Sequence, residues 1–167
     1  MEQKSEIIKP RSVAIVRRAT EEDAESLVAL INAAFAVERP IFGGDRIDLR
    51  GVRNYLKRGT FLVAEDGNEL LGCVYGELRD ESGYLGLLSV EPVRQGTGLG
   101  RRLMGAVEDL FREKGCKRVE LRVVSAREPL PAFYRRLGYV QAGIEPIPED
   151  AKTKVPCHFQ YMRKSLE

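Results

Sequence analysis

The chain has 167 residues, of which 43% are hydrophobic and 31% are charged, a composition typical of a globular domain and not of a disordered chain. The formal net charge is only +2, which is too small to predict nucleic acid or an anionic membrane as a partner. No apolar run approaches the roughly 18 residues that a membrane-spanning helix needs, so we expect no membrane partner.

The first third of the chain is predicted to form a strand followed by two helices. Val13–Arg18 is the predicted strand, and Thr20 with Asp23 has the spacing of a helix capping box. Apolar residues of the first helix recur at helical spacing, namely Ala24, Leu27, Val28, Ile31, Ala34 and Phe35. Asp45 is predicted to cap the second helix, which ends at Gly59.

The middle and the end of the chain are predicted to form antiparallel strands and then alternating helices and strands. Two strands, Phe61–Glu65 and Leu70–Leu78, flank Asp66-Gly67, a strong hairpin signal. Another tight turn leads into a strand at Tyr84–Val90. The later elements are a helix at Leu99–Lys114, a strand at Arg118–Val124, a helix at Pro131–Leu137, and strands near Tyr139–Gly143 and Cys157–Arg163.

The domain organisation is expected to be simple. Residues 1–12 lack a signal-peptide core and are predicted to form a flexible leader before a single domain at 13–167. The three cysteines, Cys73, Cys116 and Cys157, are far apart and form no CxxC pair. This pattern predicts neither a disulfide framework nor a zinc site, and it is typical of a reducing, cytoplasmic setting.

A glycine-rich loop, hereafter the glycine loop, joins the strand that ends at Val90 to the helix that begins near Leu99. Its glycines stand at alternate positions, Gly96, Gly98 and Gly100. They permit positive φ and a close approach of a ligand, so several N–H groups can converge on one anion beside the positive end of the helix dipole. Nearby arginines add positive charge: Arg94, Arg101 and Arg102. The loop therefore predicts a phosphate or pyrophosphate site.

The glycine loop fits neither of two common nucleotide-binding motifs. A dinucleotide fingerprint, Gly-x-Gly-x-x-Gly, fails because its third glycine would fall on Arg101 or Leu103. A P-loop, Gly-x-x-x-x-Gly-Lys-Ser/Thr, does not occur. A flexible turn before a helix also explains the glycines, so the loop alone does not identify a ligand.

Three motifs in a fixed order give the glycine loop a context. Gln95-x-x-Gly98-x-Gly100 resembles the coenzyme A motif of the GCN5-related N-acetyltransferase (GNAT) superfamily, Gln/Arg-x-x-Gly-x-Gly/Ala. Val16–Thr20 with Asp23-Ala24 is similar to the family's opening, and Phe133–Tyr139 is similar to its late signature. The resemblance spans roughly Val13 to Met162. It implies an α/β (α+β) GNAT fold, with a central, mixed, mostly antiparallel sheet splayed between strands 4 and 5 and helices on both faces.

The resemblance implies that acetyl-CoA is the co-substrate and that an amine attacks its thioester directly, with no metal. The pantetheine arm would pair with the main chain of Leu88, Ser89 and Val90, much as an added strand would. A backbone N–H near Leu88 would polarise the thioester carbonyl. Backbone amides of the loop would hold the pyrophosphate, namely those of Gln95, Gly96, Thr97, Gly98, Leu99, Gly100 and Arg101.

The resemblance marks a catalytic acid more clearly than a base. Tyr134 matches the family's usual acid, which protonates the departing thiolate, although it also lies in an apolar stripe and could serve only to pack the core. Some relatives carry a Glu or a His on the fourth strand as the general base; at those two positions this chain has Tyr84 and Gly86. Glu77 on the neighbouring strand is the predicted proton acceptor, directly or through water; a solvated edge carboxylate is the alternative. Arg127 stands where the family often has Asn.

The expected acceptor is a primary amine of a small molecule or a peptide, and nucleic acid is not an expected partner. The pocket for the acceptor amine is predicted between Phe35–Asp45 and Gly143–Pro156. Acidic residues of the second segment could attract a cationic amine or simply be solvated. The protein is expected to be a monomer or a homodimer. A non-catalytic acyl-CoA-binding sensor is the competing hypothesis; the weakly marked base favours it, and Tyr134 argues against it.

Overall fold

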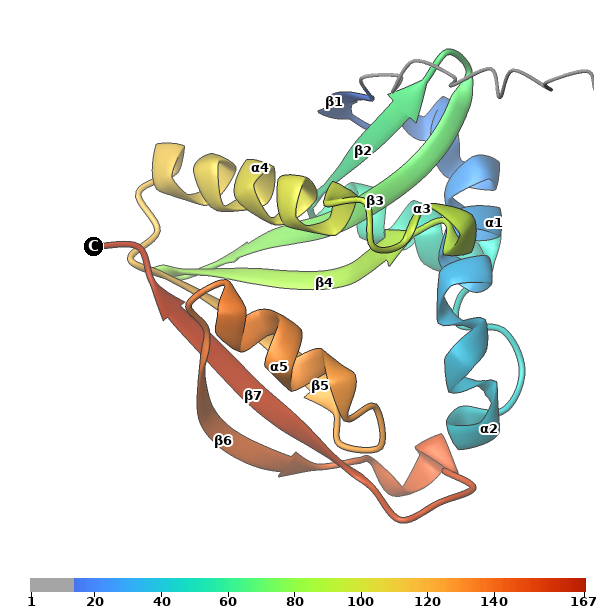
Figure 1. Cartoon of the computed structure of the whole chain (residues 1–167), viewed down its shortest axis with the longest axis vertical. Helices are drawn as coiled ribbons and strands as arrows, with labels where there is room; N and C mark the ends of the chain where they lie inside the picture. Colours follow the sequence, from blue (N-terminus) through green and yellow to red (C-terminus); the bar gives the residue numbers. More distant parts are fainter. Residues whose placement is uncertain (1–13) are drawn as a thin grey trace, which may run out of the picture.

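A computed structural model describes residues 14–167 (Figure 1). Its strands are β1 (Ile15–Arg18), β2 (Thr60–Asp66), β3 (Glu69–Arg79), β4 (Ser82–Val90), β5 (Arg118–Val124), β6 (Val140–Pro146) and β7 (His158–Ser165). They form one sheet in the order β1-β2-β3-β4-β5-β7-β6, in which β4 and β5 are parallel and the other neighbours are antiparallel. The leader predicted at 1–12 and the start of the predicted first strand at Val13 lie outside the described residues.

Helices cover both faces of the sheet. The helices are α1 (Ala24–Ala34), α2 (Arg39–Phe42), α3 (Leu49–Arg58), α4 (Leu99–Glu113) and α5 (Pro129–Arg136). Short helical turns lie between them, η1 (Glu21–Asp23), η2 (Phe35–Glu38), η3 (Pro92–Arg94) and η4 (Glu149–Ala151). α1 and α3 pack on one face, and α4 and α5 pack on the other. The predicted mixed, mostly antiparallel sheet with helices on both faces is confirmed.

Two hydrophobic cores hold the central strands between these helices. On β2, Phe61 and Val63 enter the core under α1 and α3, while Leu62 enters the core under α4 and α5, because side chains alternate along a strand. Each such burial contributes about 1.5–3 kcal/mol. Gly83 of β4 lets α4 approach closely, since a Cβ at this position would overlap the ring of Phe111. The cores therefore fix the position of β4.

β4 and β5 separate after a short parallel pairing. The paired residues are Ser82–Tyr84 on β4 and Arg118–Glu120 on β5. Beyond them, Leu85–Val90 has no partner on the β5 side within the described chain. A bulge also interrupts the pairing of β4 with β3, and Leu87 at this bulge has a φ of 52°. The predicted splay between strands 4 and 5 is confirmed, and it leaves backbone groups of β4 facing the gap.

The cap of α3 differs from the predicted one. The side chain of Asp48 accepts a hydrogen bond from the N–H of Gly51 at 2.8 Å, directly before the first helical residue. Asp45, the predicted cap, instead pairs with Arg39 at 2.9 Å. The prediction of Asp45 was wrong because two aspartates precede the helix, and Asp48 is the one whose extended backbone adjoins it.

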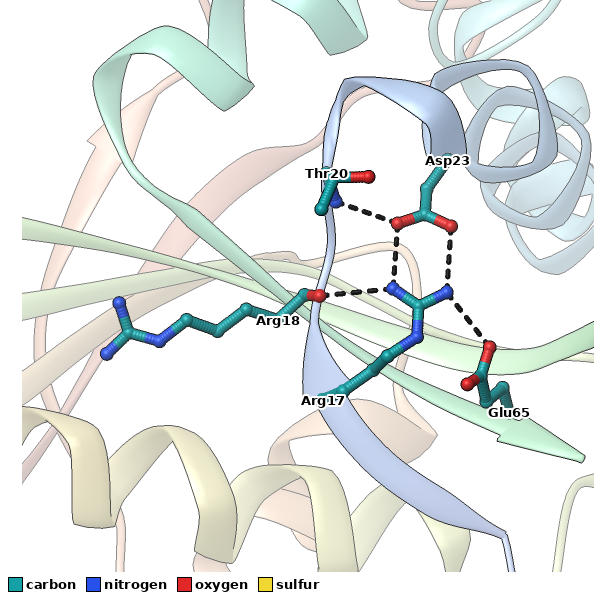
Figure 2. A network of polar contacts seen from close by, with 5 residues as sticks. All are labelled: Arg17, Arg18, Thr20, Asp23 and Glu65. Atoms are coloured by element: carbon teal, nitrogen blue, oxygen red, sulfur yellow. Dashed lines mark hydrogen bonds and ion pairs between the residues drawn. The ribbon is translucent and has the colours of Figure 1, made fainter.

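Arg17 links β1 to β2 and to the first helical turn (Figure 2). Its guanidinium donates to Asp23 at 2.8 and 2.9 Å and to Glu65 at 2.9 Å. The N–H of Thr20 donates to the same Asp23 carboxylate at 2.7 Å, as the predicted capping box requires. The hydrogen bonds from Arg17 hold the pKa values of Asp23 and Glu65 below their ordinary range, despite partial burial. The network thus stabilises the ionised carboxylates.

Arg17→Gln should lower the melting temperature by about 2 °C at pH 7, as expected for a partly exposed ion pair. Because the folded pKa values of Asp23 and Glu65 lie below the unfolded ones, this stabilisation is complete above pH 4.5 and disappears as the pH falls through the folded values. The difference from wild type should therefore shrink in melts below about pH 4. The matched control is Arg18→Gln, whose side chain points away from the network in Figure 2. Equal changes in melting temperature for Arg17→Gln and Arg18→Gln, both at pH 7 and below about pH 4, would contradict the stabilising role of the Arg17 network.

Candidate active site

The gap between β4 and β5 forms a cavity of about 1160 Å³. β4 lines it through Leu85–Leu88 and Val90, and β5 lines it through Leu121–Val124. Phe133 and Tyr134 reach it from α5, and the glycine loop borders it at the end of β4. This volume lies slightly above the range of about 300–1,000 Å³ typical of ligand pockets, so an elongated ligand and a second reactant can fit together.

The glycine loop presents the N-terminus of α4 to this cavity. Gly96 and Gly98 have φ values of 79° and 87°, and a Cβ on either would meet no atom within 4 Å. The Thr97 hydroxyl donates to the carbonyl of Arg94 at 2.6 Å, and the Gln95 side chain donates to the last carbonyl of β4 at 3.3 Å. The first N–H groups of a helix lack intrahelical partners and carry its positive partial charge. The loop can therefore bind a phosphate or pyrophosphate in the open space before it.

The loop residues predicted to hold pyrophosphate occupy this turn and the start of α4. Most of them line the cavity, namely Gln95, Gly96, Gly98, Gly100 and Arg101. The side chain of Thr97 turns back to the loop, and Leu99 packs against the core under α4 and α5. For these two residues only the backbone is left to contact a ligand.

The free edge of β4 lies where the pantetheine arm is predicted. Leu88 and Val90 line the cavity. Ser89 is buried, and its hydroxyl donates to the carbonyl of Leu87 at 2.9 Å, which agrees with the alternation of side chains along a strand. Since pairing with β5 ends at Tyr84, a ligand that contains amides can add to β4 as an extra strand would.

Tyr134 both packs in the core and lines the cavity. Its side chain is buried, and its ring meets those of Phe133 and Tyr139 edge-on, with centroids 5.1 and 5.9 Å away. Its hydroxyl forms no hydrogen bond with residues 14–167. Burial raises the pKa of Tyr134 well above its ordinary value, although the charge of Arg127 opposes this. The phenol is therefore protonated at neutral pH, and its proton is available to a ligand.

Glu77, the predicted proton acceptor, lies outside the lining of the cavity. Its carboxylate accepts hydrogen bonds from the hydroxyl of Tyr75 at 2.7 Å and from Arg79 at 3.3 Å. Burial raises the pKa of Glu77, but these hydrogen bonds outweigh it and hold the pKa below its ordinary value. Tyr75 itself lines the cavity, as do Tyr84 and Gly86. Glu77 is therefore connected to the cavity through the Tyr75 hydroxyl.

Glu38, at the end of η2, is a carboxylate in the cavity lining that the sequence analysis missed. It is 8% exposed and lies 3.4 Å from a guanidinium nitrogen of Arg127. Burial raises the pKa of Glu38, although Arg127 and Arg46 act against the rise. One signal was present in the sequence: the buried face of α1 at Ile31 and Ala34 continues to Glu38 at helical spacing.

Both segments predicted to wall the acceptor pocket reach the cavity. The first contributes Phe35, Glu38, Arg39, Phe42, Gly43, Gly44 and Asp45, and the second contributes Pro148 and Ala151. A hydrogen bond of 2.7 Å from the N–H of Lys154 to the carbonyl of Ile41 joins the two segments. The acidic residues of the second segment do not line the cavity, so they do not form an attractive wall for a cationic amine.

Other chemistry suggested by residue type finds little support in the described part of the chain. Residues 14–167 bring together no group of three His, Cys, Asp or Glu that could hold a metal. Cys73 and Cys116 are buried, and burial raises the pKa of the Cys73 thiol to about 12, which disfavours the nucleophilic thiolate. No helix within these residues has the length and hydrophobicity to cross a membrane.

Comparison with known proteins agrees with this geometry. The chain is 32% identical over 131 residues to a mycothiol acetyltransferase of Clavibacter sepedonicus, a match that covers 75% of this chain and 42% of that protein. It thus spans less than half the length of the curated relatives that it matches. Its fold resembles a ribosomal-protein-alanine N-acetyltransferase from Brucella melitensis (23% identity, TM-score 0.75, 91% of this chain and 99% of that one).

A second solved structure and a family model complete the comparison. The fold also resembles that of yncA from Salmonella typhimurium, solved with its cofactor acetyl-CoA (19% identity, TM-score 0.73, 93% of this chain and 95% of that one). The model of the acetyltransferase (GNAT) family matches residues 24–139, which is more than half of the chain. The protein therefore belongs to the GNAT family of acetyltransferases.

Proposed function

We propose that the protein is an acetyl-CoA-dependent N-acetyltransferase that acts on a primary amine of a small molecule or a peptide. One observation carries the proposal: a single cavity borders the glycine loop, the free edge of β4 and Tyr134. These three features would meet, in turn, the pyrophosphate, the pantetheine amides and the reacting thioester of acetyl-CoA. Membership of the GNAT family supports the same assignment.

The backbone would bind most of the donor. N–H groups from Gln95 to Arg101 would hold the pyrophosphate, and Leu88–Val90 would pair with the pantetheine amides. An N–H near Leu88 would hydrogen-bond the thioester oxygen, which gains negative charge as the amine attacks. Because one cavity holds both reactants, the attack becomes effectively intramolecular.

Side chains would carry the protons. As the new C–N bond forms, the C–S bond breaks, and Tyr134 would protonate the departing thiolate. The amine must lose a proton, and Glu77 would accept it by way of the Tyr75 hydroxyl or of water. Glu77 would then release its proton to solvent and Tyr134 would recover one, which completes the cycle.

An acceptor screen tests the proposal against the competing sensor hypothesis. The protein would be incubated with acetyl-CoA and a panel of amines, and thiol release and product mass would be measured. A transferase releases coenzyme A and yields an acetylated amine. A sensor binds the cofactor in a thermal melt and releases no thiol above the background of hydrolysis, and this result would overturn the proposal.

Coenzyme A should stabilise the protein more than other nucleotides do. At about 100 times Kd, a ligand stabilises its protein by about 2.7 kcal/mol, which corresponds to roughly 5–10 °C for a chain of this size. ATP and NAD lack the pantetheine arm that the β4 edge would bind, so each should give less than about half of this shift. Equal shifts from the three compounds would indicate a general nucleotide site instead.

A further inference from the structure

The cavity is lined by arginines in two separate places. Arg94 and Arg101 belong to the glycine loop and the first turn of α4, where the pyrophosphate is proposed to bind. Arg46 and Arg127 belong to the connection between α2 and α3 and to the connection between β5 and α5. Figure 1 places α2 and the β5–α5 connection together, away from the glycine loop. The connections that carry Arg46 and Arg127 therefore lie away from the glycine loop, where the donor phosphates are proposed to bind.

Arg46 and Arg127 both lie over Phe35. Their guanidinium carbons are 5.6 and 5.9 Å from the centroid of its ring. An aromatic face attracts a cation by about 0.5–2 kcal/mol, but it carries no net charge. Two guanidinium groups around one ring therefore repel each other unless anions lie close by.

Within residues 14–167, one carboxylate pairs with one of these two cations. Glu38 is 3.4 Å from Arg127, whereas Arg46 forms no ion pair with any residue of 14–167. Arg46, Arg127 and Glu38 together carry a net charge of +1. The side chains of Arg127 and Glu38 are 25% and 11% exposed, so solvent screens their charges less than that of the exposed Arg46.

Two other arginines of the cavity lining have their own carboxylates. Arg39 pairs with Asp45 at 2.9 Å. Arg122 lies 3.8 Å from Glu145 and stacks on the ring of Phe159. Arg136 also lines the cavity without an ion pair in residues 14–167, but it lies one turn after Phe133 on α5, whose ring adjoins Gly100 of the glycine loop. Beside Phe35, the unmatched positive charge therefore belongs to Arg46 and Arg127.

We propose that the acceptor carries an anionic group, a carboxylate or a phosphate, in addition to its amine, and that Arg46 and Arg127 bind this group. The inference rests on the proposed transferase function and names the class of its acceptor. A guanidinium binds either anion through paired N–H donors, and the ring of Phe35 supports the carbon chain between the anion and the amine. A second cationic group on the acceptor would meet repulsion at the same place.

Matched substrate pairs test this inference. Thiol release from acetyl-CoA would be measured with amino acids and with their carboxamides, and with phosphoethanolamine and ethanolamine. We expect kcat/KM to be at least about tenfold higher for the preferred anionic compound than for its neutral partner. The pair that shows the preference identifies the anion as a carboxylate or a phosphate.

Two charge-neutralising variants locate the subsite. Arg46→Gln should reduce the ratio of kcat/KM for the anionic compound to kcat/KM for its neutral partner toward one. Arg50→Gln removes the same charge from an exposed position of α3 outside the cavity lining and should keep the ratio. Arg46 is also exposed, so both variants should fold, which thermal melts would verify. A ratio that persists in Arg46→Gln would overturn the assignment of this residue.

The outcomes separate this inference from the proposed function. Thiol release with neutral or dicationic amines and none with anionic ones would contradict the inference alone. If none of the amines in the panel gives thiol release, the proposed function is contradicted, and the inference with it. A preference for the anionic member of a pair that disappears in Arg46→Gln would support both.

Discussion

Tyr134→Phe is expected to lower kcat by about 100-fold or more, within the range of roughly 10²–10⁴ for general acid catalysis. The variant keeps the ring, which packs against Phe133 and Tyr139, and removes only the hydroxyl. The fold and KM for acetyl-CoA should therefore change little. Because burial raises the pKa of Tyr134, the phenol remains protonated across the neutral range, and the thiolate would lose its donor in the variant.

Tyr139→Phe provides the matched control for this experiment. It also deletes a buried phenolic hydroxyl, which donates to Glu108 at 2.9 Å and lies outside the cavity lining. We expect Tyr139→Phe to lower the melting temperature and to leave kcat nearly unchanged. If Tyr134→Phe keeps kcat within a factor of two while chemistry limits the rate, Tyr134 serves only in packing, and water reprotonates the thiol.

Gly98→Glu is expected to weaken acetyl-CoA binding at least about tenfold, or about 1.4 kcal/mol. The φ of Gly98 is 87°, a conformation that strains any side chain, and the space beside it is open to the cavity. A carboxylate there would occupy the proposed pyrophosphate site and repel the anion. Isothermal calorimetry measures the loss directly.

Two further glycine variants separate the causes of this loss. Gly98→Ala carries the backbone strain without the charge, so it should weaken binding less than Gly98→Glu. Gly105→Glu adds the same charge to α4 at an exposed position with open space around it, outside the cavity lining. It should bind acetyl-CoA as wild type does. Unchanged affinity in a folded Gly98→Glu protein would remove the glycine loop from the site.

Much of the fold could be predicted from the sequence because local patterns specify local structure. The spacing of Leu27 and Ile31 indicates a helix with one buried face, and both residues are buried on α1. Asp66-Gly67 marks a hairpin between the strands that pair as β2 and β3. The alternating glycines before α4 indicate an anion-binding turn, and Gly96 and Gly98 take the expected positive φ. Each signal acts within a few residues.

The neighbourhood of each carboxylate was decided only by tertiary structure. Glu77 was predicted to accept a proton directly or through water, and the hydrogen bonds from Tyr75 and Arg79 hold it beside the cavity, where the Tyr75 hydroxyl connects the two. Glu38 had no predicted role, yet the packing of η2 after α1 buries it in the lining. Arg127, 89 positions away in sequence, provides its partner.

The sequence by itself determined the order of the strands and of the longer helices, the glycine loop and the family, because hydrophobic periodicity, turn chemistry and motif order are properties of neighbouring residues. It did not predict the short α2, which lies where a turn was expected at Pro40–Gly44. The tertiary structure decided where β4 parts from β5 and which charges face the resulting cavity. Pairing across the sheet and burial against helices depend on segments far apart in the chain, and so do the unmatched charges of Arg46 and Arg127 around Phe35. Local patterns carry no information on such contacts, since the free energy of a buried charge depends on its surroundings in space.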